Sequence, residues 1–182
     1  MAAPRQMTAK TLNALKGWPQ PAAVDFHTDF SDTTKAWILA NGPVYAGSVV
    51  HIGTTGQFEL GVGTGKVMPL FLFNNSDDPD VINEGGDPAT EKGVWIPIAP
   101  TGQAMALVAI GAYELVSTQF IAGSFPINAP LTALDSGATA GKLYAGTMYT
   151  DTIVGLVSRG VVDNGYGHDA VAFWPFPVFP HA

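Results

Sequence analysis

Hydrophobic and polar residues follow a strand-like pattern from residue 44 to the end of the chain. Short runs rich in Val, Ile, Leu, Tyr and Phe alternate with clusters of Gly, Pro, Asn and Asp. Such runs are typical of strands, and the residues between them favour turns. We expect strands in the following ranges: 44–52, 57–60, 67–73, 94–98, 104–116, 143–149, 153–162 and 170–176. Because no long helical period accompanies them, the pattern predicts a mainly β fold, an antiparallel β-barrel or sandwich.

The segment around Asn164-Gly165 predicts a β-hairpin. Residues typical of strands precede this dipeptide from Val161 and follow it as far as Phe173. Asn-Gly favours a tight turn because both residues accept a positive φ. We therefore expect the two flanking segments to pair in antiparallel fashion.

Residues 1–43 lack this alternation and contain several prolines. Thr8 is a suitable helix N-cap, and Leu12 and Leu15 would share one face of a short helix that ends at Lys16. So short a helix is marginal by itself in water. The pattern predicts an extended N-terminal arm over 1–43 that carries this helix, and a β domain over 44–182. The alternative is an ordinary terminus packed on its own domain.

The glycine-rich stretch Gly61-Val-Gly-Thr-Gly-Lys66 raises the question of a phosphate-binding loop. A Walker A loop would need a glycine at position 60 and a hydroxyl residue at position 67, where the chain has Leu60 and Val67. The dinucleotide-binding pattern also fails, because Lys66 stands in place of its third glycine. An apolar run typical of a strand follows, not a helix. We interpret the stretch as a strand, a glycine turn and a second strand.

Residues 74–91 form an acidic segment, and oxygen-rich loops of this kind can bind calcium. Five acidic residues cluster within its stretch 74–87, namely Asp77, Asp78, Asp80, Glu84 and Asp87. An EF-hand loop counted from Asp78 fails at Ile82 and at Asn83, where glycine is required. We expect a solvated loop that projects over an assembly surface, with a weaker cation site as the alternative.

Charge is sparse in this sequence. Asp, Glu, Lys and Arg make up 13% of the residues, against about a quarter in ordinary soluble domains. Either Thr, Ser, Asn and Gly cover much of the surface, or a large part of it is buried in an oligomer or assembly, and the two are compatible. The net charge of −7 argues against nucleic acid as the main partner. No apolar run has the length of a signal peptide or of a membrane span.

Candidate chemistry is limited. The absence of cysteine excludes disulfides and cysteine-based zinc sites and favours the cytosol as the compartment of synthesis. The four histidines show no metal-ligand spacing, and no serine stands in a nucleophile elbow. We expect no enzymatic activity, no cofactor and no bound metal.

Four large aromatic residues lie close together near the C-terminus, interleaved with prolines. They are Phe173, Trp174, Phe176 and Phe179. The prolines interrupt ladder pairing, so the segment should be an edge strand or an extended tail. Aromatic residues exposed together mark an interface, whereas buried ones would close the β domain. We predict an oligomer interface at these four residues, with closure of the core as the alternative.

The arrangement of the whole chain resembles the head-decoration (cement) proteins of tailed bacteriophages. The resemblance is carried by the basic, proline-containing arm and by the glycine-rich, cysteine-free β domain. It is also carried by Leu143-Tyr-Ala-Gly-Thr-Met-Tyr-Thr-Asp-Thr-Ile-Val-Gly-Leu-Val-Ser-Arg-Gly160 and the following Ala172-Phe-Trp-Pro175.

The resemblance implies a structural virion protein, made in the host cytoplasm, that binds the exterior of an expanded head. It implies a homotrimer that clamps neighbouring major capsid subunits, and an arm that lies along the capsid. The expected charged contacts of the arm are Arg5, Lys10 and Lys16, and its expected apolar anchors are Leu12, Leu15 and Trp18. We expect no contact with nucleic acid or membrane.

Two alternatives remain open on the sequence alone. One is another virion part, such as a head-fibre base or a tail-tube subunit. The other is a carbohydrate- or calcium-binding β-sandwich module that uses the acidic loop and exposed aromatic residues such as Trp95 or Trp174.

Overall fold

The computed structural model describes residues 7–11, 23–24, 30–41, 44–45, 47–65, 67–73, 97–98, 105–108, 113–163 and 169–180. The elements in them are β1 (Met7–Thr11), β2 (Ala23–Val24), α2 (Asp32–Asn41), β3 (Val44–Tyr45), β4 (Val49–Ile52), β5 (Phe58–Leu60), β6 (Pro69–Phe73), β7 (Pro97–Ile98), β8 (Met105–Val108), β9 (Tyr113–Ser117), β10 (Pro130–Ala133), β11 (Leu143–Ala145), β12 (Ile153–Asp163) and β13 (Asp169–Val178).

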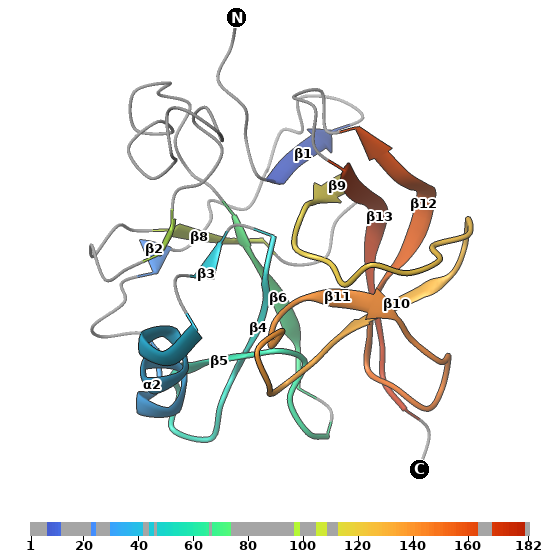
Figure 1. Cartoon of the computed structure of the whole chain (residues 1–182). Coiled ribbons are helices and arrows are strands. Elements are labelled where there is room, and N and C mark those ends of the chain that lie inside the picture. The colour runs from blue at the N-terminus through green and yellow to red at the C-terminus, as the bar shows by residue number, and fades with distance from the viewer. Residues whose placement is uncertain are drawn as a thin grey trace, which may run out of the picture.

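The strands form two large sheets and a two-stranded ribbon. Sheet A has the order β1-β9-β13-β12-β10-β11, sheet B has the order β2-β8-β6-β4-β5, and β3 pairs with β7. Figure 1 shows sheet A on the right, sheet B in the centre and α2 beside β5. All pairs within the sheets are antiparallel. The prediction of a mainly β, sandwich-like fold is confirmed, and in the part of the chain that the structure describes neither sheet closes into a barrel.

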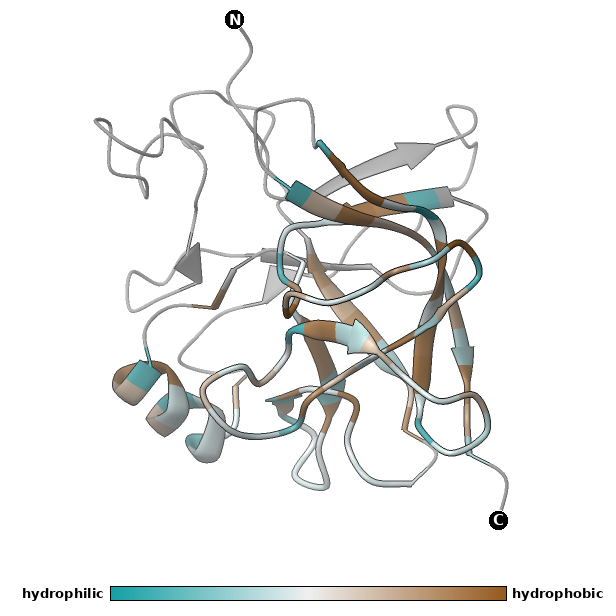
Figure 2. Ribbon diagram, turned by 45° about the vertical axis from the view of Figure 1, so that its right-hand side comes forward, coloured by the Kyte–Doolittle hydropathy of each residue, from teal (hydrophilic) through white to brown (hydrophobic). Residues whose placement is uncertain are grey.

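A single large cluster of buried hydrophobic residues joins the two sheets. Phe71 of β6 and Phe173 of β13 meet in it with ring centroids 5.1 Å apart. Val49 and Val50 of β4 and Leu115 of β9 are fully buried in the same cluster. Figure 2 shows hydrophobic residues concentrated along the strands of both sheets, while the connecting loops are more polar. Burial of this apolar surface is the main force that holds the sheets together.

The hairpin of β12 and β13 confirms the pairing predicted around Asn164-Gly165. Its outermost pair in the register is Asp163 with Asp169, and the residues between them lie outside the described part of the chain. β13 pairs with β9 only at residues 171–173. Beyond Phe173, where the prolines begin, β12 is the one partner strand of β13 among the described residues, which agrees with an edge position for that half.

The glycine-rich stretch is a turn between strands, as predicted. β5 precedes it, β6 follows it, and both strands pair with β4. Gly61, Gly63 and Gly65 have φ values of +89°, +71° and +82°, a backbone conformation that favours glycine. The spacing of the glycines is therefore explained by backbone conformation.

Helix α2 was not predicted, and local hydrogen bonds explain both of its ends. The Ser31 side chain accepts a hydrogen bond from the Thr34 N–H at 3.2 Å, which makes Ser31 the N-cap. Asp32 in the first turn interacts favourably with the helix dipole. At the other end the Asn41 side chain donates to the Trp37 carbonyl at 2.9 Å, and Gly42-Pro43 follows in the sequence. Ile38 is buried against the core.

Two predictions for the N-terminal region need correction. The helix expected from Thr8 is wrong in its first part, because Met7–Thr11 is strand β1, paired with β9 at the edge of sheet A. The arm predicted over 1–43 is also too long, because residues 30–41 pack on the β domain and Phe30 is fully buried in its core.

Some predicted features lie outside the described residues. These are the acidic loop 74–91 and the positions of Arg5, Leu12, Leu15, Lys16, Trp18 and Trp95.

Candidate functional site

The predicted aromatic interface divides into a buried and an exposed part. Phe173 is fully buried in the core, so its assignment to an oligomer interface is wrong. Trp174 is 37% exposed and Phe176 is 54% exposed, while Phe179 is half-buried. Successive side chains of a strand point to opposite faces, which explains the contrast between Phe173 and Trp174. The interface role of the other three stays a prediction.

The exposed aromatics lie on the outer side of the β12–β13 pair. Leu156 is the register partner of Trp174, so their side chains share one face. We call Leu156, Trp174 and Phe176 the aromatic face. Toward the other end of β13, the outward residues Ala170 and Ala172 are fully buried with Val116 in a second small cluster. The exposed apolar surface is therefore confined to the proline-containing half of the strand.

A charged cluster accompanies β9 and β12 in the same sheet. Glu114 accepts two hydrogen bonds from Arg159, both at 2.8 Å, and a third from the Ser158 hydroxyl at 2.6 Å. The Glu114 side chain is only 13% exposed. A two-pronged pair of this kind holds its side chains in one orientation, so it adds rigidity to sheet A.

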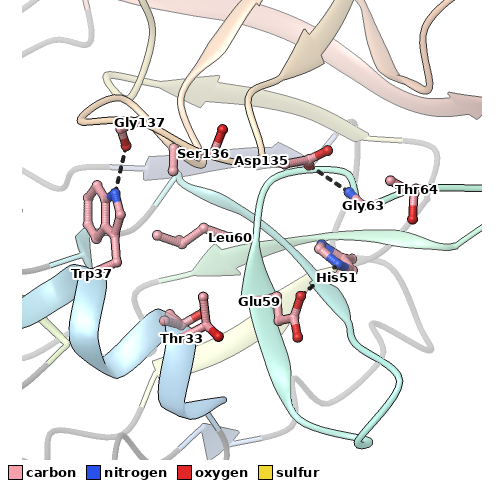
Figure 3. A pocket seen from close by; sticks show the side chains of 12 residues that line it. Thr33, Trp37, His51, Glu59, Leu60, Gly63, Thr64, Asp135, Ser136 and Gly137 are labelled. Atoms are coloured by element: carbon pink, nitrogen blue, oxygen red, sulfur yellow. Dashed lines mark hydrogen bonds and ion pairs between the residues drawn. The ribbon is translucent and has the colours of Figure 1, made fainter.

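A pocket of about 250 Å³ lies between α2, the β4–β5 hairpin, the glycine turn and the loop before residue 140. Figure 3 shows it from close by. It is lined by Thr33, Thr34, Trp37, His51, Glu59, Leu60, Gly63, Thr64, Asp135, Ser136, Gly137 and Ala140. We call it the helix-side pocket.

Trp37 forms one wall of the helix-side pocket. Its indole N–H donates to the Gly137 carbonyl at 2.6 Å, a contact between residues 100 positions apart. This bond joins α2 to the loop on the far side of the pocket and fixes the plane of the ring (Figure 3). Leu60 supplies a second apolar surface from β5.

The polar side of the helix-side pocket carries two carboxylates and a histidine. Asp135 accepts a hydrogen bond from the Gly63 backbone N–H at 2.7 Å, which ties its loop to the glycine turn. His51 Nδ1 lies 3.1 Å from the Gly61 carbonyl, and its Nε2 lies 3.6 Å from Glu59 Oε2. Because a carbonyl can only accept, Nδ1 carries a proton when it makes this bond.

The chemistry of the helix-side pocket favours a neutral or cationic polar molecule. Among the described residues, no Lys or Arg lines it, and Glu59 and Asp135 give it negative potential. Within the described part of the chain, no group of three or more His, Asp or Glu side chains is placed to hold a metal ion. The arrangement is therefore suited to recognition by hydrogen bonds and apolar contact.

The expected contacts of the arm are not brought together in the described residues. Lys10 lies in β1, in register with Glu114, and the other five lie outside the described residues.

The sequence pattern did not predict the helix-side pocket. Trp37, Glu59 and Asp135 come from three separate segments, and Gly63 and Asp135 are 72 positions apart. The sequence signals available there were turn signals at 61–65 and at 135–137, and neither indicates that the two turns meet.

The comparisons with protein families, curated proteins and solved structures found no match for the chain. Among the described residues, no helix is long and apolar enough to span a membrane.

Proposed function

We propose that the chain is a decoration protein of a tailed-bacteriophage head. In this proposal it binds the outer surface of the expanded capsid and cements neighbouring major capsid subunits as a homotrimer. The observation that carries the proposal is the aromatic face, an exposed apolar surface on sheet A of a chain that is poor in charge. Surfaces of this kind mark sites of protein association. Many weak contacts repeated over a lattice combine into strong attachment, so each copy needs only a modest contact.

The position of β1 supports a role for the N-terminal segment in docking. β1 is the outermost strand of sheet A, so one of its edges has no partner strand in the described chain. An unpaired strand edge is a template for pairing with another chain. The basic residues near β1 in sequence, Arg5 and Lys16, complete a segment suited to an acidic partner surface.

Sedimentation tests capsid attachment directly. The lysate in which the protein is made is fractionated on a density gradient, with and without mild salt. We expect the protein to travel with particles of capsid mass. If it stays at the mass of a free trimer or monomer in both conditions, the decoration role is wrong.

The aromatic face is tested by the double substitution Trp174→Ser with Phe176→Ser. We expect the trimer to dissociate, because both side chains lose most of their apolar area at the contact. The matched control is Leu39→Ser, which removes an apolar side chain that is 77% exposed on α2. Analytical ultracentrifugation measures the mass. If the double variant is still a trimer, or if the wild-type protein is a monomer, the aromatic face is not a trimer interface.

The arm is tested by charge reversal, because deleting its first 24 residues would also remove β1 and β2. Arg5→Glu with Lys16→Glu should weaken co-sedimentation with heads and make the remainder less sensitive to salt. Lys142→Glu, a change of the same sign elsewhere on the chain, serves as the control. If the wild type, the double variant and the Lys142→Glu control bind heads equally well, the arm is not part of the docking surface.

A further inference from the structure

The helix-side pocket combines apolar walls with hydrogen-bonding groups. Trp37 and Leu60 offer flat apolar surface, and hydroxyl groups come from Thr33, Thr64 and Ser136. Ligand sites in proteins typically have this composition, with a few polar groups that fix the orientation of the ligand. We propose that the helix-side pocket binds one pyranose ring of an uncharged glycan.

The two faces of a pyranose match the two sides of this pocket. The C–H groups of a sugar ring form an apolar surface that can pack on an indole by dispersion. Its hydroxyl groups can donate to the Glu59 and Asp135 carboxylates, and hydrogen bonds to a charged acceptor are stronger than neutral ones. The volume of about 250 Å³ lies just below the range of about 300–1,000 Å³ found for drug-sized ligands, which suits a single ring.

The groups that would contact the sugar are held in place before it binds. Trp37 is held by Gly137, and Asp135 is held by the Gly63 backbone. Ordering of side chains on binding weakens affinity, so a pocket with fixed walls retains more of its contact energy.

The same contacts argue against other occupants. A divalent cation such as calcium takes about six to eight oxygen ligands, and Asp135 already accepts from a backbone N–H. An anionic sugar or a phosphate would meet two carboxylates, and the described residues of the lining include no Lys or Arg to offset them. Unlike these ions, a neutral sugar ring brings no like charge to the two carboxylates and can donate hydroxyl hydrogen bonds to their oxygens.

This inference does not depend on capsid attachment. The helix-side pocket is built from α2, the strands β4 and β5, and two turns, whereas the aromatic face belongs to β12 and β13 (Figure 1). Sugar binding and particle binding are therefore separable by substitution, and either can fail while the other holds.

Saturation-transfer NMR on the full chain tests the proposal. The probes are the methyl glycosides of glucose, mannose, galactose and N-acetylglucosamine at millimolar concentration, with methyl glucuronide as the charged comparison. We expect signals on the ring C–H protons of at least one neutral glycoside and none from the glucuronide. Glu59→Gln should weaken the affinity roughly tenfold, because one charge-assisted bond is lost.

Three variants test whether the sugar binds in the helix-side pocket or elsewhere on the surface. Thr33→Tyr places a large side chain in the pocket mouth from an exposed helical position and should abolish the signals. Thr55→Tyr, the same change in the exposed β4–β5 turn outside the lining, should leave them intact. Ser136→Tyr gives a second blocking variant from the opposite wall. The proposal is overturned if no neutral glycoside gives signals, if the glucuronide binds as well, or if both blocking variants bind like the wild type.

Discussion

Phe173 and Phe176 are three residues apart on β13, yet the fold gives them opposite environments. Phe173 is fully buried and packs against Phe71, whereas Phe176 is 54% exposed. Truncation of each to alanine removes the same atoms. The difference between the two losses of stability therefore measures the environment alone, and each variant is the control of the other.

The expected magnitudes are well separated. Phe173→Ala leaves a cavity between the sheets, and such changes destabilise a core by about 3–5 kcal/mol. Phe176→Ala loses only the burial of the part of the ring that was covered, and it should lower stability by about 1 kcal/mol. For a chain of this length the melting temperature should fall by roughly 6–20 °C in the first variant and by about 2–4 °C in the second.

The assay is urea unfolding of both variants at a concentration low enough to keep the protein dissociated. This condition matters because self-association stabilises the folded state by mass action and would add an interface contribution at Phe176. Intrinsic fluorescence and circular dichroism should report a single transition. Equal losses, or a smaller loss for Phe173→Ala, would show that the division of β13 into core and surface is wrong.

Three further predictions concern the glycine turn, a tyrosine and the charged cluster. Gly61→Ala should destabilise more than Gly65→Ala in thermal unfolding: both have positive φ, worth about 1–2 kcal/mol, but an added Cβ meets neighbouring backbone only at Gly61. Similar losses in both variants would contradict this contrast. Burial, followed by the nearby aspartates, raises the pKa of Tyr144 above its ordinary value of 10.0. The phenol therefore contributes stability that is complete below pH 10.0 and is lost as pH rises through the folded pKa. Ultraviolet titration should show a late phenolate transition that Tyr144→Phe removes, and its persistence would refute the assignment. Glu114→Gln should lower stability by about 1–3 kcal/mol, because the Glu114 carboxylate is mostly buried, whereas Asp32→Asn, at an exposed carboxylate, should lower it by less than about 1 kcal/mol in the same assay.

Local patterns in the sequence were sufficient for the parts of the fold that depend on neighbouring residues. The strand, glycine turn and strand from β5 to β6 could be predicted because residues at positive φ favour glycine wherever they occur. The β12–β13 hairpin could be predicted because its two strands adjoin one loop. The mainly antiparallel class followed from the same short-range signals.

Tertiary contacts decided the N-terminal region. Thr33 and Thr34 are β-branched and disfavour a helix, so α2 depends on its Ser31 cap and on burial of Ile38. The sequence pattern from Thr8 to Lys16 favours a helix, but the edge of β9 offers backbone partners to Met7–Thr11 and this segment becomes a strand. In both segments, tertiary contacts override a weak local preference for helix or strand.

In the candidate sites, too, some features followed from local sequence and others from tertiary contacts. Composition and local pattern were enough to show that aromatic residues gather near the C-terminus, that charge is sparse, and that turns occur at 61–65 and 135–137. The packing of the sheets and the helix was needed to show that Phe173 enters the core while Trp174 faces outward, and that Trp37, Glu59 and Asp135 line one pocket. The physical reason is that burial and pocket geometry arise from residues far apart in the chain, and their meeting depends on how the two sheets and the helix pack.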